Sequence, residues 1–231
     1  MKRLSQLLDL FFPNVCIVCK EKLTNNHCIC QKCLNELVLL DIKKCFFCGE
    51  NPAQNGLCEN CKKELHFDGL VSAYKFDNII QLLIHNLKYN EYMKIGKHLG
   101  ELLANRLSKY EFISDIDFII PVPLHKVKER ERGFNQSYLI SKEISNILKI
   151  PLGKNIIKRS KYTKTQTKLT KEEREKNVGD AFEIKYPELV KEKIFLIVDD
   201  VITTGSTMKS IALLLKGIGA RKFYAASISR A

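Results

Sequence analysis

The sequence predicts an α/β protein with a mostly parallel sheet, preceded by a small zinc-binding module. Three observations lead to this prediction: four CxxC pairs lie within the first 61 residues, apolar runs alternate with amphipathic segments after them, and polar motifs follow two of the apolar runs. Strands that alternate with helices are typical of a parallel sheet. At 231 residues, the chain is long enough for one such core and a small extra module.

Residues 1–13 are expected to form a short amphipathic helix. Lys2 and Arg3 precede a leucine-rich stretch, as in a secretory signal, but Gln6 and Asp9 interrupt that stretch. No segment reaches about eighteen consecutive apolar residues, so we expect no membrane span. The sequence therefore predicts a cytoplasmic protein.

Eight of the nine cysteines form CxxC pairs, a spacing typical of zinc sites. The segment CLNEL after Cys30 recurs as CKKEL after Cys58, which indicates two copies of one small unit. We expect a double zinc ribbon over residues 14–66, with two closed tetrahedral sites of structural zinc. The first pair is expected to bind with the second and the third with the fourth, although a cross-braced pairing also fits the sequence. The expected ligands are Cys16, Cys19, Cys30, Cys33, Cys45, Cys48, Cys58 and Cys61.

Metal has to hold this module together, because about fifty residues with few large apolar side chains cannot fold by burial alone. Disulfides are disfavoured, since the chain shows no secretory signal. Cys28, the ninth cysteine, is expected to be a packed thiol and not a ligand.

The α/β domain is expected over residues 67–231. Apolar runs predict strands at 70–76, 117–122, 194–198 and 222–228. Amphipathic periodicity predicts helices at 78–87, 95–107 and 135–148, and another after Ser206. Ligands of such sheets bind at the carboxyl ends of the strands. The segments after residues 121 and 198 are therefore the candidate binding loops.

The first of these loops follows the apolar run at 194–198 and carries two carboxylates and a hydroxyl-rich turn. Backbone N–H groups at a helix N-terminus bind phosphate, and a glycine lets the backbone approach the ligand. Adjacent carboxylates accept hydrogen bonds from vicinal sugar hydroxyls or hold Mg²⁺ through water. An ordinary capped helix would explain the hydroxyls but not the acids. The candidate residues are Asp199, Asp200, Thr203, Thr204, Gly205, Ser206 and Thr207.

The second loop, IPVPLHKVKERERGFNQS, brings cations and amides to the start of the next helix. Arginine binds phosphate oxygens in a bidentate manner. A solvated basic loop is the alternative for KVKERER alone, but the adjoining RGFNQ favours an anion site. The candidate residues are Val122, Pro123, Leu124, Arg130, Arg132, Gly133, Asn135 and Gln136.

These motifs resemble those of a known family. VDDVITTGST is similar to the phosphoribosyl pyrophosphate (PRPP) motif of type I phosphoribosyltransferases. This resemblance implies a type I phosphoribosyltransferase sheet in which the acid pair meets the ribose hydroxyls, the turn holds the 5-phosphate, and the loop after the second strand holds the pyrophosphate. Asp199, Asp200 and Arg132 are then the candidate catalytic residues, with Mg²⁺ as cofactor. With PVPLH, ERGFNQ and the preceding CxxC pairs, nearly the whole chain resembles the ComF family, whose members include proteins of bacterial DNA uptake.

Basic charge is concentrated near these loops. Residues 126–176 contain fifteen Lys and Arg against six Asp and Glu, in a chain of net charge +12. Such a surface binds single-stranded DNA through its phosphates, although a funnel for polyanionic PRPP needs the same charge. The polar part of this region, 157–180, is expected to be a lid over PRPP or a mobile surface loop.

Two functions fit the sequence. In the first, a ComF-like protein binds PRPP and single-stranded DNA during DNA uptake and natural transformation, with proteins of the uptake machinery as further partners. In the second, an active phosphoribosyltransferase moves ribose 5-phosphate from PRPP to a base or amine in nucleotide metabolism. The glutamine-hydrolysing activity often attributed to such chains is disfavoured, because every paired cysteine is committed to metal.

Overall fold

The computed structural model describes residues 14–24, 27–50, 54–89, 92–160 and 181–231. The helix expected over 1–13 lies outside these residues, as does most of the lid expected over 157–180.

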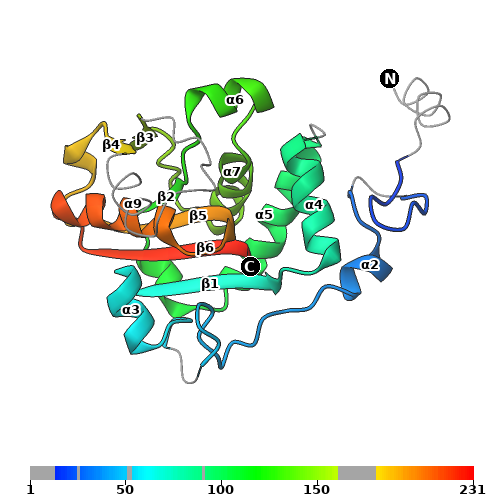
Figure 1. Ribbon diagram of the computed structural model, residues 1–231, viewed down its shortest axis with the longest axis horizontal. Coiled ribbons are helices and arrows are strands. Elements are labelled where there is room, and N and C mark those ends of the chain that lie inside the picture. Colours follow the sequence, from blue (N-terminus) through cyan, green and yellow to red (C-terminus); the bar gives the residue numbers. More distant parts are fainter. Residues whose placement is uncertain (1–13, 25–26, 51–53, 90–91, 161–180) are drawn as a thin grey trace, which may run out of the picture.

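A four-stranded parallel sheet forms the centre of the molecule (Figure 1), in the order β1-β6-β5-β2. Its strands are β1 (Gly69–Lys75), β2 (Phe118–Pro121), β5 (Ile194–Ile202) and β6 (Lys222–Arg230). The central strands are buried on both faces, as parallel strands covered by helices usually are. A separate antiparallel pair consists of β3 (Ile157–Arg159) and β4 (Phe182–Ile184). The predicted mostly parallel α/β sheet is confirmed.

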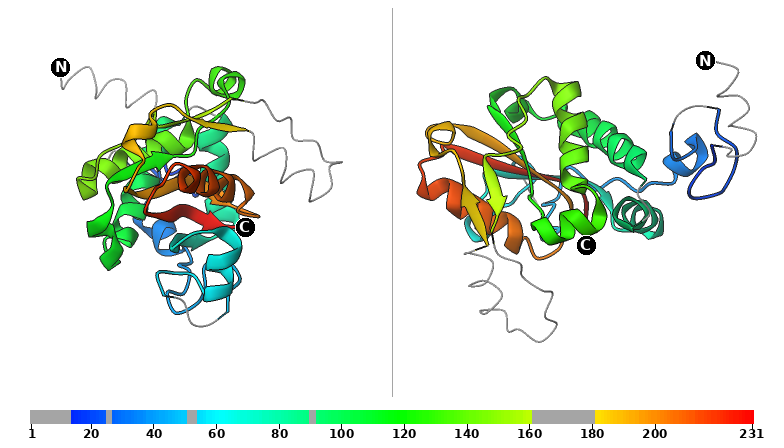
Figure 2. Two further views of the ribbon diagram at one scale, coloured as in Figure 1. Left: turned by 90° about the vertical axis from the view of Figure 1, so that its left-hand side faces the viewer. Right: turned by 90° about the horizontal axis from the view of Figure 1, so that it is seen from above.

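Helices cover both faces of this sheet. On one side lie α4 (Asn78–Tyr89), α5 (Met93–Leu107) and α7 (Gln136–Leu148). The opposite side carries α9 (Ser206–Gly217), and Figure 2 shows α7 and α9 on either side of the strands. The chain therefore leaves β2 and β5 toward different faces, which opens a crevice at their carboxyl ends.

Helices α5 and α7 pack unusually closely because α5 presents two glycines to α7. A Cβ atom built on Gly96 would lie 2.7 Å from Cβ of Leu139, and one on Gly100 would lie 2.8 Å from the carbonyl oxygen of Ile140. Any larger residue at either position would push α7 away. Because α7 begins beside the ends of β2 and β5, this packing fixes one wall of the crevice.

Two elements differ from the sequence-based expectation. Strand β5 continues past the acid pair to Ile202, because β6 is long enough to pair with it as far as Arg230. A helix, α6 (Lys126–Arg132), replaces the expected basic loop. His125 Nδ1 accepts a hydrogen bond from Val127 N at 3.2 Å to begin this helix, and Gly133, at φ +77°, ends it. The short 3-10 helices η1 (Glu111–Asp115) and η2 (Pro187–Leu189) complete the connections.

The two cysteine units are structural repeats. Cys16 N donates to the carbonyl of Glu21 at 2.8 Å, and Cys45 N donates to that of Glu50 at 2.7 Å. In the same way, Ile17 N donates to the carbonyl of Cys28 and Phe46 N to that of Gly56. Each unit ends in a short helix, α2 (Gln31–Asn35) in the first and α3 (Glu59–Leu65) in the second. The repeat seen in the sequence is therefore a repeat of backbone conformation.

The two ribbons lie toward opposite ends of the molecule, as the positions of α2 and α3 show (Figure 1). The segment that connects them runs along the free edge of β1. There Leu40 N donates to the carbonyl of Ala73 and Lys75 N donates to that of Val38, at 3.0 and 2.9 Å. This pairing covers an edge that would otherwise be open to another strand.

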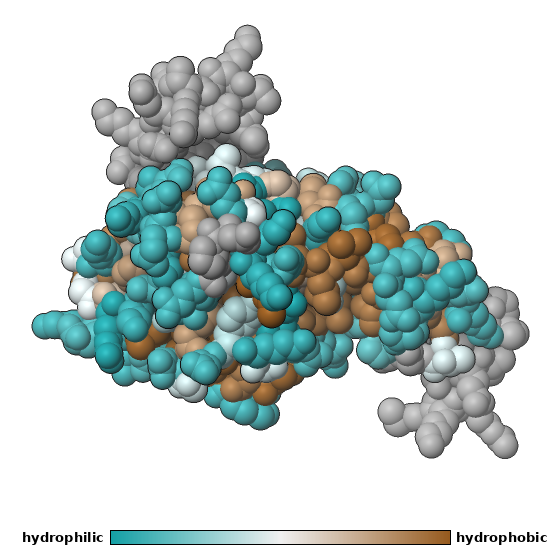
Figure 3. All heavy atoms as spheres, turned by 90° about the horizontal axis from the view of Figure 1, so that it is seen from below, coloured by the Kyte–Doolittle hydropathy of each residue, from teal (hydrophilic) through white to brown (hydrophobic). Residues whose placement is uncertain are grey.

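The surface seen from below is mostly polar, with apolar residues exposed in patches between the charged ones (Figure 3). Among the described residues, no helix combines the length and the apolar character that crossing a membrane requires.

Candidate functional site

The acid pair on β5 is held by residues of two helices. Lys88, near the end of α4, forms an ion pair with Asp200, its Nζ lying 2.5 Å from Oδ2. Gln136 Nε2 donates to the other Asp200 oxygen at 3.5 Å. Ser137 Oγ donates to Oδ1 of Asp199 at 2.7 Å. The start of α7 and the end of α4 therefore fix both carboxylates at the crevice.

Asp199 sits in a setting that disfavours its negative charge. Burial raises the pKa of Asp199 above its ordinary value, and the neighbouring Asp200 carboxylate raises it further. Hydrogen bonds from Ser137 and from the Asp200 backbone act in the opposite direction without cancelling the rise. Hydroxyl donors or a cation placed here would stabilise the ionised form. The pair is therefore suited to bind such groups.

The hydroxyl-rich turn follows directly on the same strand. Thr204 Oγ1 lies 2.8 Å from Ser206 Oγ, and Gly205 adopts φ +71° immediately before α9 begins at Ser206. Asp199 lines a small pocket together with this turn, from Thr203 to Met208. The helix N-terminus and the hydroxyls face one concave surface, as an anion site requires.

The floor of this turn belongs to the second zinc ribbon. A Cβ atom built on Gly205 would lie 2.9 Å from Leu65 Cδ2 and 3.4 Å from Phe47 Cε2. Leu65 ends α3, and Phe47 lies between two cysteines of the ribbon. Glycine therefore lets the turn rest directly on the ribbon, and it also tolerates the left-handed backbone conformation.

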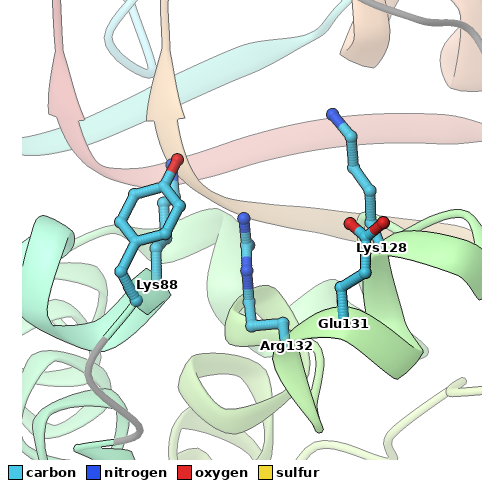
Figure 4. Close-up of a pocket in the computed structure, with 5 residues that line it drawn as sticks. Lys88, Lys128, Glu131 and Arg132 are labelled. Carbon is cyan, nitrogen blue, oxygen red and sulfur yellow. The ribbon is translucent and has the colours of Figure 1, made fainter.

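A basic pocket of about 350 Å³ opens between α4 and α6. Figure 4 shows Lys88, Arg132 and Lys128 pointing to the same side, toward the strands. The guanidinium of Arg132 lies 5.7 Å from the centre of the Tyr89 ring and donates a hydrogen bond to Gln136. Glu131 is the acidic residue of the lining.

The cations of this pocket repel one another. Burial lowers the pKa of Lys128, and the charges of Arg159 and Arg132 lower it further. A bound anion would relieve this repulsion. The pocket is therefore suited to an anion, and it adjoins the acid pair through Lys88, whereas the hydroxyl-rich turn adjoins the pair through Asp199.

Two groups of four cysteines meet the requirements of zinc. The Sγ atoms of each group lie within 4.8 Å of one another. Cys19 and Cys30 are 3.6 Å apart and Cys48 and Cys58 are 3.7 Å apart, close to the ~3.8 Å edge of a tetrahedron with Zn–S bonds of about 2.3 Å. The predicted pairing of first with second and third with fourth CxxC is confirmed, and the cross-braced alternative is wrong. The groups are Cys16, Cys19, Cys30 and Cys33, and Cys45, Cys48, Cys58 and Cys61.

The backbone prepares the first cysteine of each ribbon for metal. Burial by itself would raise the pKa of Cys16, but N–H groups of the surrounding loop hold it below its ordinary value. Cys30 N, for example, donates to Cys16 Sγ at 3.3 Å. The same balance of burial and backbone N–H groups lowers the pKa of Cys45. Zinc requires the thiolate form, which these bonds favour.

Comparison with known proteins places this arrangement in a family. A double zinc ribbon domain matches residues 7–62, and a phosphoribosyl transferase domain matches residues 135–230. Competence protein F of Haemophilus influenzae is 33% identical over 231 residues, which cover 96% of this chain and 99% of that protein. The chain belongs to the ComF family. DNA utilization protein YhgH of Escherichia coli O157:H7 is 33% identical over 217 residues, covering 91% of this chain and 94% of that protein. Competence protein ComFC of Bacillus subtilis is 28% identical over 200 residues, covering 82% and 79%.

In this ComF-family chain, several residues that the sequence predicted to bind the ligand hold the backbone around the site. Asn135 is buried, accepts a hydrogen bond from Ser137 N at 3.0 Å and donates to the carbonyl of Val122 at 3.0 Å, so it shapes the loop. Val122 N donates to the carbonyl of Val198, and Pro123 and Leu124 follow it toward α6. Gly133 ends α6. Arg130 is exposed on α6, while Arg132 lines the basic pocket.

Sequence patterns did not link two residues to the acid pair that the structure places beside it, Lys88 as its ion-pair partner and Ser137 as a donor. Lys88 lies 112 positions before Asp200, so only the fold brings them together. Cys28 is buried and lies outside both cysteine groups, as expected. Burial raises the pKa of its thiol to about 11, which keeps it protonated.

Proposed function

We propose that this ComF-family protein binds PRPP with Mg²⁺ at the carboxyl ends of β2 and β5, and that it handles single-stranded DNA in the cytoplasm during DNA uptake. The observation that carries the proposal is that the acid pair adjoins two features suited to anions, the turn at the start of α9 and the basic pocket between α4 and α6. PRPP has the matching order of groups, with a sugar diol between a phosphate and a pyrophosphate.

Each group of PRPP has a counterpart in this site. The 5-phosphate would bind at the turn of residues 203–207, where backbone N–H groups and hydroxyls are available. The ribose hydroxyls would donate to Asp199 and Asp200. The pyrophosphate would lie toward Arg132 and Lys88, whose positive charges suit it.

Magnesium fits the same residues. It is a hard cation that keeps several waters and binds phosphate oxygens together with one or two carboxylates. The acid pair supplies such carboxylates, and the raised pKa of Asp199 indicates that a bound cation would stabilise its ionised form. Bound Mg²⁺ would neutralise part of the pyrophosphate charge.

The DNA part of the proposal is supported by relatives and by charge. The relatives are named for competence and DNA utilization. Outside the pocket lining, α6 exposes Lys126 and Arg130, which can bind DNA phosphates. DNA could thus run along α6 beside the PRPP site.

Titration calorimetry with PRPP and Mg²⁺ tests the ligand. The wild type should bind, and Asp199→Asn/Asp200→Asn should lose binding by more than about tenfold. Asp117→Asn is a matched control, because Asp117 pairs with Lys193 at 3.0 Å where the same two strands begin. The control should bind like the wild type. Absence of heat with the wild type, or unchanged affinity of the double variant, would refute the PRPP site.

Oligonucleotide titration at several salt concentrations tests the DNA role. Binding of single-stranded DNA should weaken steeply as salt rises, because phosphate contacts release counterions. Lys126→Glu/Arg130→Glu should weaken binding further. Lys216→Glu/Lys222→Glu reverses the same number of exposed charges where α9 ends and β6 begins, and should bind like the wild type. Equal loss in both variants would mean that DNA binds without using α6.

Active phosphoribosyl transfer is a second candidate, favoured by the volume of about 350 Å³ of the same basic pocket, which would take an acceptor beside the pyrophosphate. Pyrophosphate release from PRPP in the presence of bases or amines would establish it. Binding of PRPP without release would leave the sugar phosphate as a ligand of a DNA-handling protein.

A further inference from the structure

Three metal-ligating side chains meet at the junction between the first zinc ribbon and α5, outside both cysteine groups. His27 Nδ1 lies 3.0 Å from His98 Nδ1, and His98 Nδ1 lies 3.3 Å from Glu101 Oε2. All three donor atoms lie within 4.8 Å of one another. We propose that His27, His98 and Glu101 form a third metal site, which takes a divalent transition metal such as Zn²⁺.

The spacing of the donor atoms fits a tetrahedral ion. Zinc bonds to histidine nitrogen and carboxylate oxygen of about 2.0 to 2.2 Å place neighbouring ligand atoms ~3.3 to 3.5 Å apart. The distances of 3.0 and 3.3 Å are near that range, so an ion could enter with small movements. The two imidazole rings lie edge to face at 80°, and their Nδ1 atoms approach each other.

An ion also satisfies the three groups better than a proton does. Two Nδ1 lone pairs that face each other at 3.0 Å repel unless one nitrogen is protonated, and the carboxylate competes for the same proton. A divalent cation binds both lone pairs and the carboxylate at once. The Glu101 side chain is 31% exposed, so water can complete the coordination.

The site would fasten the first ribbon to the α/β domain. His98 and Glu101 are one helical turn apart on α5, and the partner histidine comes from the loop between the first and second CxxC pairs. In the repeated ribbon, the position equivalent to His27 is Asn55, whose carbonyl accepts a hydrogen bond from Leu70 N of β1 at 2.9 Å. The same position of the repeat thus docks both ribbons, by a side chain in one and by backbone in the other.

The third ion is expected to be the most weakly held. His98 is 6% exposed, and its Nε2 has no hydrogen-bond partner among the described residues. Metal-bound histidines usually donate their second ring nitrogen to an oxygen, and loss of such a partner lowers metal affinity by about 10- to 100-fold. A chelator should therefore remove this ion before the two ions bound by cysteines.

The test is to count zinc in the tag-free, full-length protein by mass spectrometry after equilibration with buffered Zn²⁺. The wild type should hold three equivalents, and His27→Gln and Glu101→Gln should hold two. His85→Gln is the matched control, because His85 is an exposed histidine on α4, and it should hold three. Two equivalents in the wild type at saturating zinc, or a third equivalent retained by His27→Gln, would overturn the proposal.

Cobalt substitution gives a second, independent readout. Cobalt bound by cysteine produces intense thiolate charge-transfer absorption, which a site of histidine and carboxylate lacks. The third equivalent of Co²⁺ should add weak visible absorption without adding to the thiolate band, and His27→Gln should abolish that step. A third equivalent that raises the thiolate band would place the ion elsewhere, and circular dichroism checks that each variant is folded.

Discussion

The two zinc ribbons are built alike but dock on the α/β domain in different ways. At equivalent positions, the first ribbon has Cys28 and the second has Gly56, since each carbonyl accepts a hydrogen bond from the residue after the first ribbon cysteine. A Cβ atom on Gly56 would lie 1.9 Å from the carbonyl oxygen of Leu70, so β1 packs directly against this ribbon. Cys28 fills the corresponding space in the first ribbon with a buried side chain. Because Gly56 has no Cβ, the second ribbon packs directly against the α/β domain.

Because the two ribbons dock on the α/β domain differently, we expect them to have different roles. The second ribbon supports the hydroxyl-rich turn through Leu65 and Phe47, whereas the first contacts α5 through His27. We therefore expect loss of the second zinc to damage the proposed PRPP site, and loss of the first zinc to spare it.

The largest expected effect comes from Cys48→Ser compared with Cys19→Ser. Both cysteines are exposed, and both occupy the second position of the first CxxC pair in their ribbon. Structural zinc contributes about 10 to 16 kcal/mol in peptide hosts, so either change should unfold its own ribbon. Cys48→Ser should also lower the thermal midpoint of the α/β domain by more than about 10 °C and weaken PRPP binding by more than about tenfold.

Cys19→Ser should bind PRPP within about twofold of the wild type. Scanning calorimetry and PRPP titration of the two variants give both quantities. Equal losses of PRPP affinity would show that the ribbons do not differ in the way proposed.

Next in size is Leu65→Ala compared with Leu37→Ala. The two leucines are equivalent in the repeat and both are buried. Each truncation should cost about 2 to 5 kcal/mol of unfolding free energy, because it leaves a cavity. Only Leu65→Ala removes a side chain from beneath Gly205, so only this variant should also weaken PRPP binding. Denaturant unfolding measures the shared effect, and calorimetry measures the separate one.

A smaller effect is expected from Gly205→Ala compared with Gly133→Ala. Both glycines have positive φ, +71° and +77°, so both variants should lose about 1 kcal/mol to backbone strain. At Gly205 the new Cβ would also press on Leu65, whereas nothing lies within 4 Å of one at Gly133. Gly205→Ala should therefore be the less stable variant, and Leu65→Val in the same chain should recover part of the difference. Equal thermal midpoints for the two alanine variants would mean that the turn moves away from Leu65 at no measurable cost in stability.

The sequence was sufficient for features that depend on local spacing. The cysteine pairs, the strand that leads to Asp199 and Asp200, and the helix over 135–148, which starts one residue later at Gln136, were all predicted, because each depends on residues close together in the chain. Helix α6 was not predicted, since a run of alternating charges has no apolar face to indicate a helix. The length of β5 depends on its neighbour β6, which local sequence does not describe.

Contacts between segments far apart in the chain could not be predicted from the sequence. The ion pair of Lys88 with Asp200 and the approach of His27 to His98 join residues far apart in the chain, and no local pattern marks them. The contact of Gly205 with the second ribbon was also not predicted. A glycine was expected there because it lets the backbone approach a ligand, but it also makes room for Leu65 and Phe47 of the ribbon.

The smallest expected effect comes from Phe47→Val, which gives the second ribbon the residue that the first has at Val18. The guanidinium of Arg230 lies 4.7 Å from the centre of the Phe47 ring, at the end of β6. Loss of this cation–π contact should cost about 0.5 to 2 kcal/mol, a thermal shift of a few degrees. Val18→Phe, the reverse exchange, should leave the α/β domain unchanged, because the first ribbon lies beyond α4 and α5, apart from β6 (Figure 1). If Phe47→Val lowers PRPP affinity while the zinc content stays the same, the ribbon supports the turn through its side chains. If affinity falls only when zinc is lost, the metal-held backbone alone provides that support.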